Sequence, residues 1–359
     1  MSAATRSPDD RPPSFRCPSC GASAAFSPEE GTIVCAHCGA TSPIEADGAK
    51  VAEEDLLAAL EALRDREEAD DRVVHRCAGC GAETTLPDGV TACACAFCGT
   101  PVVAAARSVK LVRPKALLPF RVGGEESLKR FRDWVGRRWF APGDFRAWAR
   151  DPGTLAGTYV PFWTFDARTA TDYVGQRGDH YTVTVVEGSR RRTETRTRWS
   201  LRWGRVDVAF DDLLVPATDV VPPDLARRLE PWDLGALVPY ADDYLGGFRA
   251  LSYRIPLAQA FAVAKRRMEA DVDAAVRADI GGDRQQVWRA ETHWDGLSFK
   301  HVLLPLWSCS YRYRDRTYRF LVNARTGEVQ GERPWSAWKI VLLVLGVAAG
   351  IGAIVLAAR

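Results

Sequence analysis

The sequence lacks the motifs of nucleotide-driven enzymes and of common hydrolases. No Gly-Lys dipeptide occurs in its 359 residues, so it has no Gly-x-x-x-x-Gly-Lys-[Ser/Thr] phosphate loop. It also has no His-Glu-x-x-His and no Gly-x-Ser-x-Gly motif, and its five histidines are scattered. We therefore predict that the chain is not an enzyme, and we exclude helicase activity.

Positive charge and a signal peptide are missing from the N-terminal part. Residues 17–40 and 77–100 contain no Lys or Arg, which disfavours phosphate binding there. Residues 1–14 are polar and have no apolar core, so they are not a signal peptide, and we predict that they are disordered. Without a sign of secretion, disulfides are not the expected use of the ten cysteines.

Eight of those cysteines form four Cys-x-x-Cys-Gly knuckles in two matched pairs. Fourteen residues separate the knuckles within each pair, and each cysteine of the second pair lies sixty positions after its counterpart. This register predicts two four-cysteine metal ribbons. The predicted ligands are Cys17, Cys20, Cys35 and Cys38 in the first ribbon, and Cys77, Cys80, Cys95 and Cys98 in the second.

We expect one zinc ion in each ribbon, because four thiolates match tetrahedral zinc and a segment this short needs a metal to fold. Iron in a rubredoxin-like site remains an alternative, although the short spacers carry few aromatic side chains to shield it. Cys93 breaks the register and is predicted to be a spare thiol. Cys309 lies in an apolar strand and is predicted to be a buried small hydrophobe.

The C-terminal part contains a long apolar run. Residues 340–358 have no polar side chain, and Trp335, Trp338 and Lys339 precede them. This pattern predicts one transmembrane helix that anchors the chain in the cell (inner) membrane, with the N-terminal region in the cytoplasm. Gly346 and Gly350 form a Gly-x-x-x-Gly that can make a homodimer face, although ordinary small residues explain them equally well.

The segment between the ribbons and the anchor has the composition of a folded core. Helical spacing of apolar residues predicts helices over residues 125–137 and 257–280, and alternation predicts hairpins over 181–203 and 301–322. The fold class we expect is multi-domain: two small four-cysteine zinc ribbons, an α+β domain rich in antiparallel sheet, and one C-terminal transmembrane helix. The expected parts are a disordered N-terminus (1–14), ribbon 1 (15–42), an acidic helical linker (43–74), ribbon 2 (75–104), the α+β domain (105–334, with a candidate duplication of about 115–205 and 250–330) and the anchor (335–359).

Arginines concentrate on the first predicted hairpin. In its second strand, the tryptophans at 199 and 203 face one way and the arginines at 196, 198 and 202 face the other. A solvated face, a contact with anionic lipid and a contact with nucleic acid all remain open. The candidate lipid or anion contacts are Arg190, Arg191, Arg192, Arg196, Arg198 and Arg202.

Several body segments resemble a family of bacterial membrane-anchored zinc-ribbon proteins. The segments are residues 159–166, 175–178, 210–217, 231–234 and 318–335, and the likeness covers nearly the whole chain. Members are often labelled primosomal protein N-prime (replication factor Y), a superfamily II helicase, a label that derives from cysteine ribbons. The resemblance implies that related ribbon proteins work with flotillin-like or phage-shock membrane-stress proteins.

These observations together predict a membrane-anchored adaptor whose ribbons recruit a cytoplasmic protein partner. The ribbons suit a protein partner better than nucleic acid, because they lack Lys and Arg and each four-thiolate zinc site adds about two negative charges. The alternative is a membrane-tethered nucleic-acid-binding or replication-associated protein. The identity of the partner does not follow from the sequence.

Overall fold

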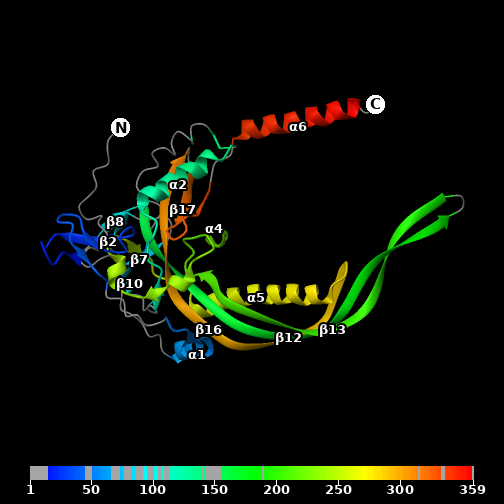
Figure 1. Ribbon diagram of the computed structural model, residues 1–359, viewed down its shortest axis with the longest axis horizontal. Helices are drawn as coiled ribbons and strands as arrows, with labels where there is room; N and C mark the ends of the chain where they lie inside the picture. Colours follow the sequence, from blue (N-terminus) through cyan, green and yellow to red (C-terminus); the bar gives the residue numbers. More distant parts are fainter. Residues whose placement is uncertain are drawn as a thin grey trace.

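The computed structural model describes most of the chain. The described residues are 15–44, 51–65, 73–76, 82–85, 92–94, 101–103, 107–108, 114–139, 141–142, 145, 155–187, 190–313, 316–332 and 336–357. A nine-stranded, mostly antiparallel sheet dominates these residues, and few helices accompany it (Figure 1). The prediction of extensive antiparallel sheet in the body is therefore confirmed.

Three very long strands make the centre of this sheet. β12 (Ala156–Glu187) pairs with β13 (Arg190–Pro216) on one side and with β16 (Arg284–Tyr313) on the other, antiparallel in both cases. The remaining strands of this sheet are β5 (Glu54–Asp55), β11 (Ala116–Leu117), β14 (Val238–Pro239), β15 (Arg249–Ala250), β17 (Arg316–Asn323) and β18 (Val329–Gly331).

Helices cover both faces of the sheet near its wide end, which we call the base (residues 156–166 of β12 and their partners). The helices are α1 (Leu56–Asp65), α2 (Gly124–Gly136), α4 (Pro223–Arg228) and α5 (Leu257–Ile280), with 3-10 turns η2 (Leu234–Ala236) and η3 (Asp242–Leu245). Phe162 packs in one core cluster with Leu225 of α4, whereas Trp163 packs in another with Met268 of α5. Both faces of the base are therefore sealed.

The helix predicted at residues 257–280 is confirmed, and α2 lies within one residue of its predicted bounds. Seven residues of α5 are buried at intervals of three or four, as a one-sided apolar stripe requires. Gly281 ends the helix with φ at 67°, a conformation that favours glycine.

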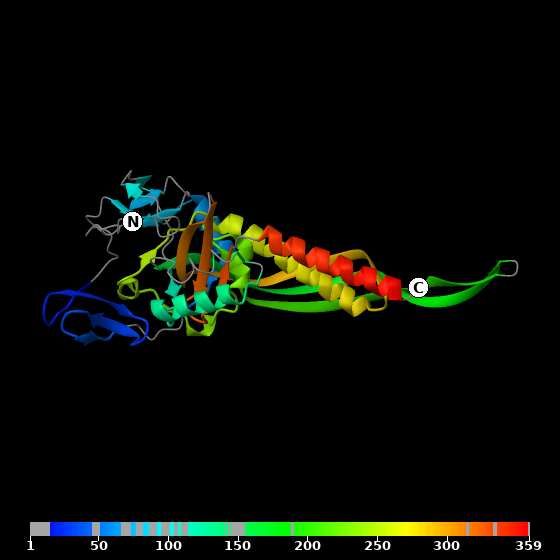
Figure 2. The ribbon, with the colours of Figure 1, turned by 90° about the horizontal axis from the view of Figure 1, so that it is seen from above.

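Beyond the base, the three strands continue as a curved arm, which we define as residues 168–187 of β12 with their partners. The last β12 residue that pairs with β16 is Gly178, opposite Arg284, so the tip of the arm has two strands only. Figure 1 shows α5 on the inner, concave side of the arm, and Figure 2 shows the tip extending far beyond the helix. Both predicted hairpins are confirmed, since the strands of each pair up to Glu187 opposite Arg190 and up to Tyr313 opposite Arg316.

A short break in the pairing separates the base from the arm. The register of β12 shifts at Asp166 against both neighbouring strands, and Asp212 on β13 has φ at 53°. Asp166 accepts hydrogen bonds from the Asp212 N–H and the Ser298 hydroxyl, and the charge of Lys300 acts on it. The side chain of Lys300 is 8 % exposed and lies 2.7 Å from Asp212 and 3.2 Å from Glu53. The base therefore ends in a cluster of three carboxylates around one lysine.

The order of elements repeats along the sheet. A short strand, a helix and a long hairpin follow one another in β11, α2, β12 and β13, and again in β15, α5, β16 and β17. β11 pairs in parallel with β16, and β15 pairs in parallel with β12. The short strand of each half thus pairs with a long strand of the other half. This pattern fits the internal duplication suggested by the sequence, and the duplication itself stays a prediction.

The linker after the first ribbon packs on the body. β5 pairs with Ser298 and Phe299 of β16, and Leu56 at the start of α1 is completely buried in the cluster around Trp163. Glu54 lies 3.2 Å from Lys115. The sequence predicted an acidic helical linker here, and the apolar stripe of its helix attaches it to the sheet.

Three smaller sheets complete the described strands. The first ribbon contains β1 (Phe15–Arg16), β2 (Ser23–Ser27), β3 (Thr32–Cys35) and β4 (Thr41–Ser42). The other two sheets contain β6 (Val73–Arg76), β7 (Glu83–Thr85) and β10 (Arg107–Ser108), and β8 (Ala92–Ala94) and β9 (Pro101–Val103).

The structure corrects the predicted fold class, partner and location. Crossing a bilayer takes about 20 consecutive apolar residues in one helix, and no helix among the described residues is both long and apolar enough. α6 (Ala337–Ala357) includes residues 340–357 of the apolar run. By the finding on helix length and hydropathy, the predicted transmembrane anchor, membrane partner and inner-membrane location were wrong. The predicted homodimer through Gly346 and Gly350 depended on this membrane span, so it is not supported either. The described residues contain one cysteine cluster where the sequence predicted two.

Candidate metal centre

The first cysteine set forms two facing knuckles. In each, the glycine after the second cysteine donates its N–H to the first cysteine's carbonyl: Gly21 to Cys17 at 2.8 Å and Gly39 to Cys35 at 2.9 Å. Both glycines have φ at 72°, and this left-handed conformation closes the turn. The spacing in the sequence thus produces two similar turns, one before β2 and one at the end of β3.

The four sulfur atoms converge on one point. The Sγ atoms of Cys17 and Cys38 lie 3.6 Å apart, as do those of Cys20 and Cys35, and all four sulfurs lie within 4.8 Å of one another. A tetrahedron with metal–sulfur bonds of about 2.3 Å has edges of about 3.8 Å. This four-cysteine group can therefore hold one metal ion, as the sequence predicted.

Hydrogen bonds from backbone N–H groups lower the pKa of two of the thiols, which favours the thiolate form that binds a metal. Hydrogen bonds from the backbone of Cys20 and then Ser19 lower the pKa of the Cys17 thiol to about 6, and the backbone of Cys38 and then His37 lowers the pKa of Cys35. For Cys20, a bond from the Ala22 backbone acts to lower the pKa, but the neighbouring thiol of Cys38 and burial outweigh it and raise the pKa to about 12. Negative charge on the first thiolates opposes further ionisation, and a bound cation removes that opposition.

The ribbon is seated on the base of the large sheet. Phe26 of β2 is 4 % exposed, and its ring lies 5.4 Å from Tyr244 and 6.3 Å from Phe248. Its backbone N–H donates to the Gly246 carbonyl at 2.9 Å. The buried and exposed members alternate among the ligands: Cys17 and Cys35 are buried, whereas Cys20 and Cys38 face solvent. This contact was not predicted from the sequence, where a phenylalanine between two knuckles was its only signal.

Of the six remaining cysteines, four lie outside the described residues and two lie in strands. The second ligand set, Cys77, Cys80, Cys95 and Cys98, lies outside the described residues. Cys93 lies in β8 opposite Val102. Cys309 is 5 % exposed in an apolar cluster, where burial raises the pKa of its thiol to about 11, so its prediction as a buried hydrophobe is confirmed.

The predicted arginine contacts lie on the arm. The pairing register places Arg192, Arg196, Arg198 and Arg202 on the same face as Gly175, which lies against Ile280 of α5. Leu201 and Trp203 belong to the opposite face and are 52 % and 70 % exposed, so the predicted alternation is confirmed. Arg191 pairs with Val186 on that outer face, and Arg190 pairs with Glu187. Their role in lipid or anion binding stays a prediction.

A sequence comparison finds one similar protein over nearly the whole chain. An uncharacterized protein, YdjG, of Bacillus subtilis (strain 168) is 28 % identical over 342 residues, which are 94 % of this chain and 94 % of that protein. The likeness is therefore not confined to the cysteine motifs. No family model and no solved structure matches the chain.

Proposed function

We propose that the chain is a non-enzymatic zinc-ribbon adaptor that recruits a protein partner. The observation that carries this proposal is the packing of the four-cysteine ribbon on the large sheet through Phe26, which shares a buried cluster with Tyr159 and Leu303. The resemblance to zinc-ribbon proteins adds support, since it implies that related ribbon proteins work with flotillin-like or phage-shock proteins.

Zinc is the metal we assign to Cys17, Cys20, Cys35 and Cys38. Four thiolates complete a tetrahedral zinc site and leave no position for water or substrate, which is typical of structural rather than catalytic zinc. The ribbon's own core is small, with four buried residues of which two are ligands, so metal binding is its main source of folding energy. In this role zinc holds the ribbon in shape and does no chemistry.

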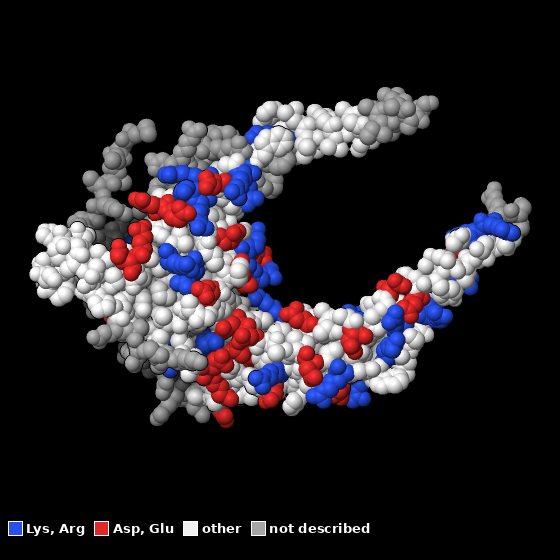
Figure 3. Space-filling view, in the orientation of Figure 1, with Lys and Arg blue, Asp and Glu red and all other residues white. Residues whose placement is uncertain are grey.

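The surface of the ribbon suits a protein better than a nucleic acid. Residues 17–40 contain two acidic residues, Glu29 and Glu30, and no basic ones, and the ribbon lobe at the left of Figure 3 is mostly uncharged. Binding to a phosphate backbone depends on Lys and Arg. The nucleic-acid alternative therefore rests on the arginines of the arm alone.

The metal assignment is tested by counting zinc in the purified chain. We expect Cys17→Ser to contain one zinc ion fewer than the wild type, and to expose the ribbon to protease, because metal binding contributes on the order of 10 kcal/mol to folding such a segment. Cys309→Ala is the matched control, since it changes a cysteine in the sheet core and keeps the zinc count. An unchanged count in Cys17→Ser would refute the zinc site.

The adaptor role is tested by crosslinking in intact cells followed by mass spectrometry. A partner that crosslinks to the wild type and to Cys309→Ala, and is lost in Cys17→Ser, supports recruitment that depends on the folded ribbon. A salt-sensitive gel shift with DNA, in the absence of such a partner, would favour the nucleic-acid alternative.

A further inference from the structure

β18 is an edge strand of the large sheet. Its three residues pair with β17 on one side, in the register Val322 with Val329, Leu321 with Gln330 and Phe320 with Gly331, and no described strand pairs with its other side. An open edge presents backbone N–H and C=O groups that can pair with another extended chain.

The hydrogen bonds to β17 show which residues of this edge are open. Asn323 donates to the Glu328 carbonyl and Glu332 donates to the Arg319 carbonyl, each at 2.9 Å. In an antiparallel ladder alternate residues bond to a given neighbour, so Glu328 and Glu332 turn toward β17. Val329 and Gly331 therefore turn their backbone groups away from it, toward the open side.

Two adjoining cavities follow this edge. Residues 327–329 line a cavity of about 470 Å³, and residues 330–332 line one of about 520 Å³. Trp134 and Arg138 of the α2 region line both cavities, and Asp224 and Arg228 of α4 line the second. The cavities thus form one groove along the strand, which we call the β18 groove.

The two helices lie on opposite faces of the sheet at this edge. Phe131 of α2 stacks on Phe320 at 3.5 Å and belongs to a cluster with Val329, whereas Leu225 of α4 belongs to a cluster with Leu321. Neighbouring residues of β17 therefore face different helices. A strand added to β18 would continue the sheet between α2 and α4.

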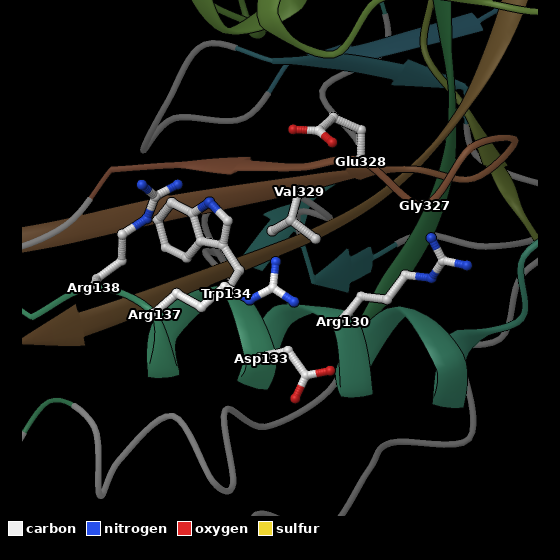
Figure 4. Close-up of a pocket in the computed structure, with 8 residues that line it drawn as sticks. All are labelled: Arg130, Asp133, Trp134, Arg137, Arg138, Gly327, Glu328 and Val329. Atoms are coloured by element: carbon white, nitrogen blue, oxygen red, sulfur yellow. The ribbon is translucent and has the colours of Figure 1, made fainter.

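The α2 wall of the groove offers unused hydrogen-bond donors. The Nε1 atom of Trp134 is buried and has no hydrogen-bond partner within the described part of the chain, and the Arg138 guanidinium lies 4.6 Å from the centre of its ring. Arg137 forms no ion pair with a described residue. Figure 4 shows Trp134 and Arg137 on the side of α2 that faces β18, Arg130 extending toward Gly327, and Asp133 pointing away.

Arg130 is held in place at one end of this wall. It donates from Nε to Glu126 and from Nη1 to the Thr326 carbonyl, each at 2.9 Å. Gly327 has φ at 77°, and a Cβ there would meet Arg130 Nη1 at 2.1 Å. Glycine at this position therefore both makes the turn before β18 and leaves room for the arginine.

We propose that the β18 groove binds an extended peptide segment of a protein partner by strand addition. The backbone of the peptide pairs with Val329 and Gly331, and an acidic side chain of the peptide meets Arg137. Three guanidinium groups and two carboxylates line the first cavity, and Glu328 is already bonded to Gln330, whereas two guanidinium groups and two carboxylates line the second. The excess of positive charge that an acidic side chain would meet therefore lies in the first cavity, beside Val329. This inference rests on the proposed adaptor function and locates a contact for its partner.

The test selects peptides from a phage-displayed library of random 12-residue sequences against the zinc-loaded full chain. Selected peptides are then synthesised with single N-methyl groups along their backbone, and binding is measured by fluorescence polarisation. Strand addition predicts that N-methylation at alternate positions weakens binding about tenfold or more, while the positions between are tolerated. Equal tolerance at every position would overturn the proposal, as would a selection that enriches no peptide.

Protein variants locate the peptide in the groove. We expect Arg137→Gln to weaken binding about tenfold, in line with loss of a charge-assisted hydrogen bond, and Trp134→Phe to weaken it less. Arg132→Gln is the matched control, because Arg132 is an exposed arginine of the same helix outside both cavities. Equal binding by Arg137→Gln, Trp134→Phe and Arg132→Gln would place the peptides elsewhere and refute the site.

The failure of this inference and that of the adaptor function are distinguishable. If the crosslinked partner is lost in Cys17→Ser but retained in Arg137→Gln and Trp134→Phe, the adaptor function holds and the β18 groove is not its contact. If sedimentation shows a dimer of the wild type that Arg137→Gln dissociates, a second copy occupies the edge and the proposed partner peptide is wrong. If peptides bind with the alternate N-methyl pattern but no partner depends on the ribbon, the groove stands and the adaptor function fails.

Discussion

The base of the large sheet and its arm are built from the same three strands in opposite surroundings. Trp163 at the base is completely buried and donates from Nε1 to the Ile255 carbonyl at 2.9 Å, while Trp203 on the arm is 70 % exposed. Helices cover both faces of the base, whereas α5 covers only the inner face of the arm and ends beside Gly175.

The difference shows that strand pattern and strand burial are separate properties. Both regions alternate their side chains between two faces, but a face becomes a core only where another element packs on it. A two-stranded ribbon without such cover is marginally stable by itself. The tip of the arm therefore depends on the three-stranded part behind it, and the base dominates the free energy of unfolding.

The largest expected loss of stability is at Trp163, the buried tryptophan of the base. Trp163→Ala leaves a cavity among the aromatic and apolar residues of the α5 cluster, so we expect it to lower the free energy of unfolding by about 3–5 kcal/mol. The measurement is guanidinium unfolding of the full chain. A loss below about 1 kcal/mol would mean that the base is not the tightly packed part.

A smaller effect is expected at Asp166, where the base meets the arm. Burial raises the pKa of this carboxyl to about 6, although the backbone N–H of Asp212 and the charge of Lys300 oppose the rise. Because its pKa is higher in the folded than in the unfolded chain, the ionised group costs stability above pH 6, and the cost disappears as the pH falls.

The pH test compares the wild type with Asp166→Asn at pH 7 and pH 5. We expect the wild type to gain about 1 kcal/mol more than the variant on going to pH 5. Glu53 has a lowered pKa, from hydrogen bonding to Ser298 and the nearby Lys300, and its stabilisation is lost only below its unfolded pKa, outside this window. The same pH dependence in both proteins would show that Asp166 does not titrate there.

The smallest effect is expected on the arm. Trp203→Ala should change the free energy of unfolding by no more than about 0.5 kcal/mol, because the side chain is already largely in water. Guanidinium unfolding beside Trp163→Ala makes the two tryptophans matched controls for each other. A loss comparable to that of Trp163→Ala would show that the outer face of the arm is covered in solution.

Local patterns in the sequence predicted much of the fold and of the site. The apolar stripe from Leu257 to Ile280 gave the bounds of α5, and the Cys-x-x-Cys-Gly spacing predicted the convergence of four sulfurs, because helix period and knuckle geometry depend on residues a few positions apart. The apolar run at 340–358 led to the wrong prediction of a membrane span.

Contacts between distant residues were out of reach of the sequence. Lys300 meets Glu53 across 247 positions, and Arg130 meets the Thr326 carbonyl across 196. No local signal predicts such a pair, because its members are neighbours only after the sheet has formed. The β18 groove went unnoticed for the same reason, since its residues come from α2, α4 and the strand after the second hairpin.

By itself the sequence determined the four-cysteine cluster that can hold a metal, the long helix, the two hairpins and the two faces of the arm, all of which follow from residue spacing along one segment. The tertiary structure alone decided that the ribbon and the linker are attached to the sheet, which part of the long strands is buried, and that β18 lies between two helices with one side unpaired by any described strand. The physical reason is that burial and open edges are properties of packed elements, and a segment acquires them only from the neighbours that the fold brings to it.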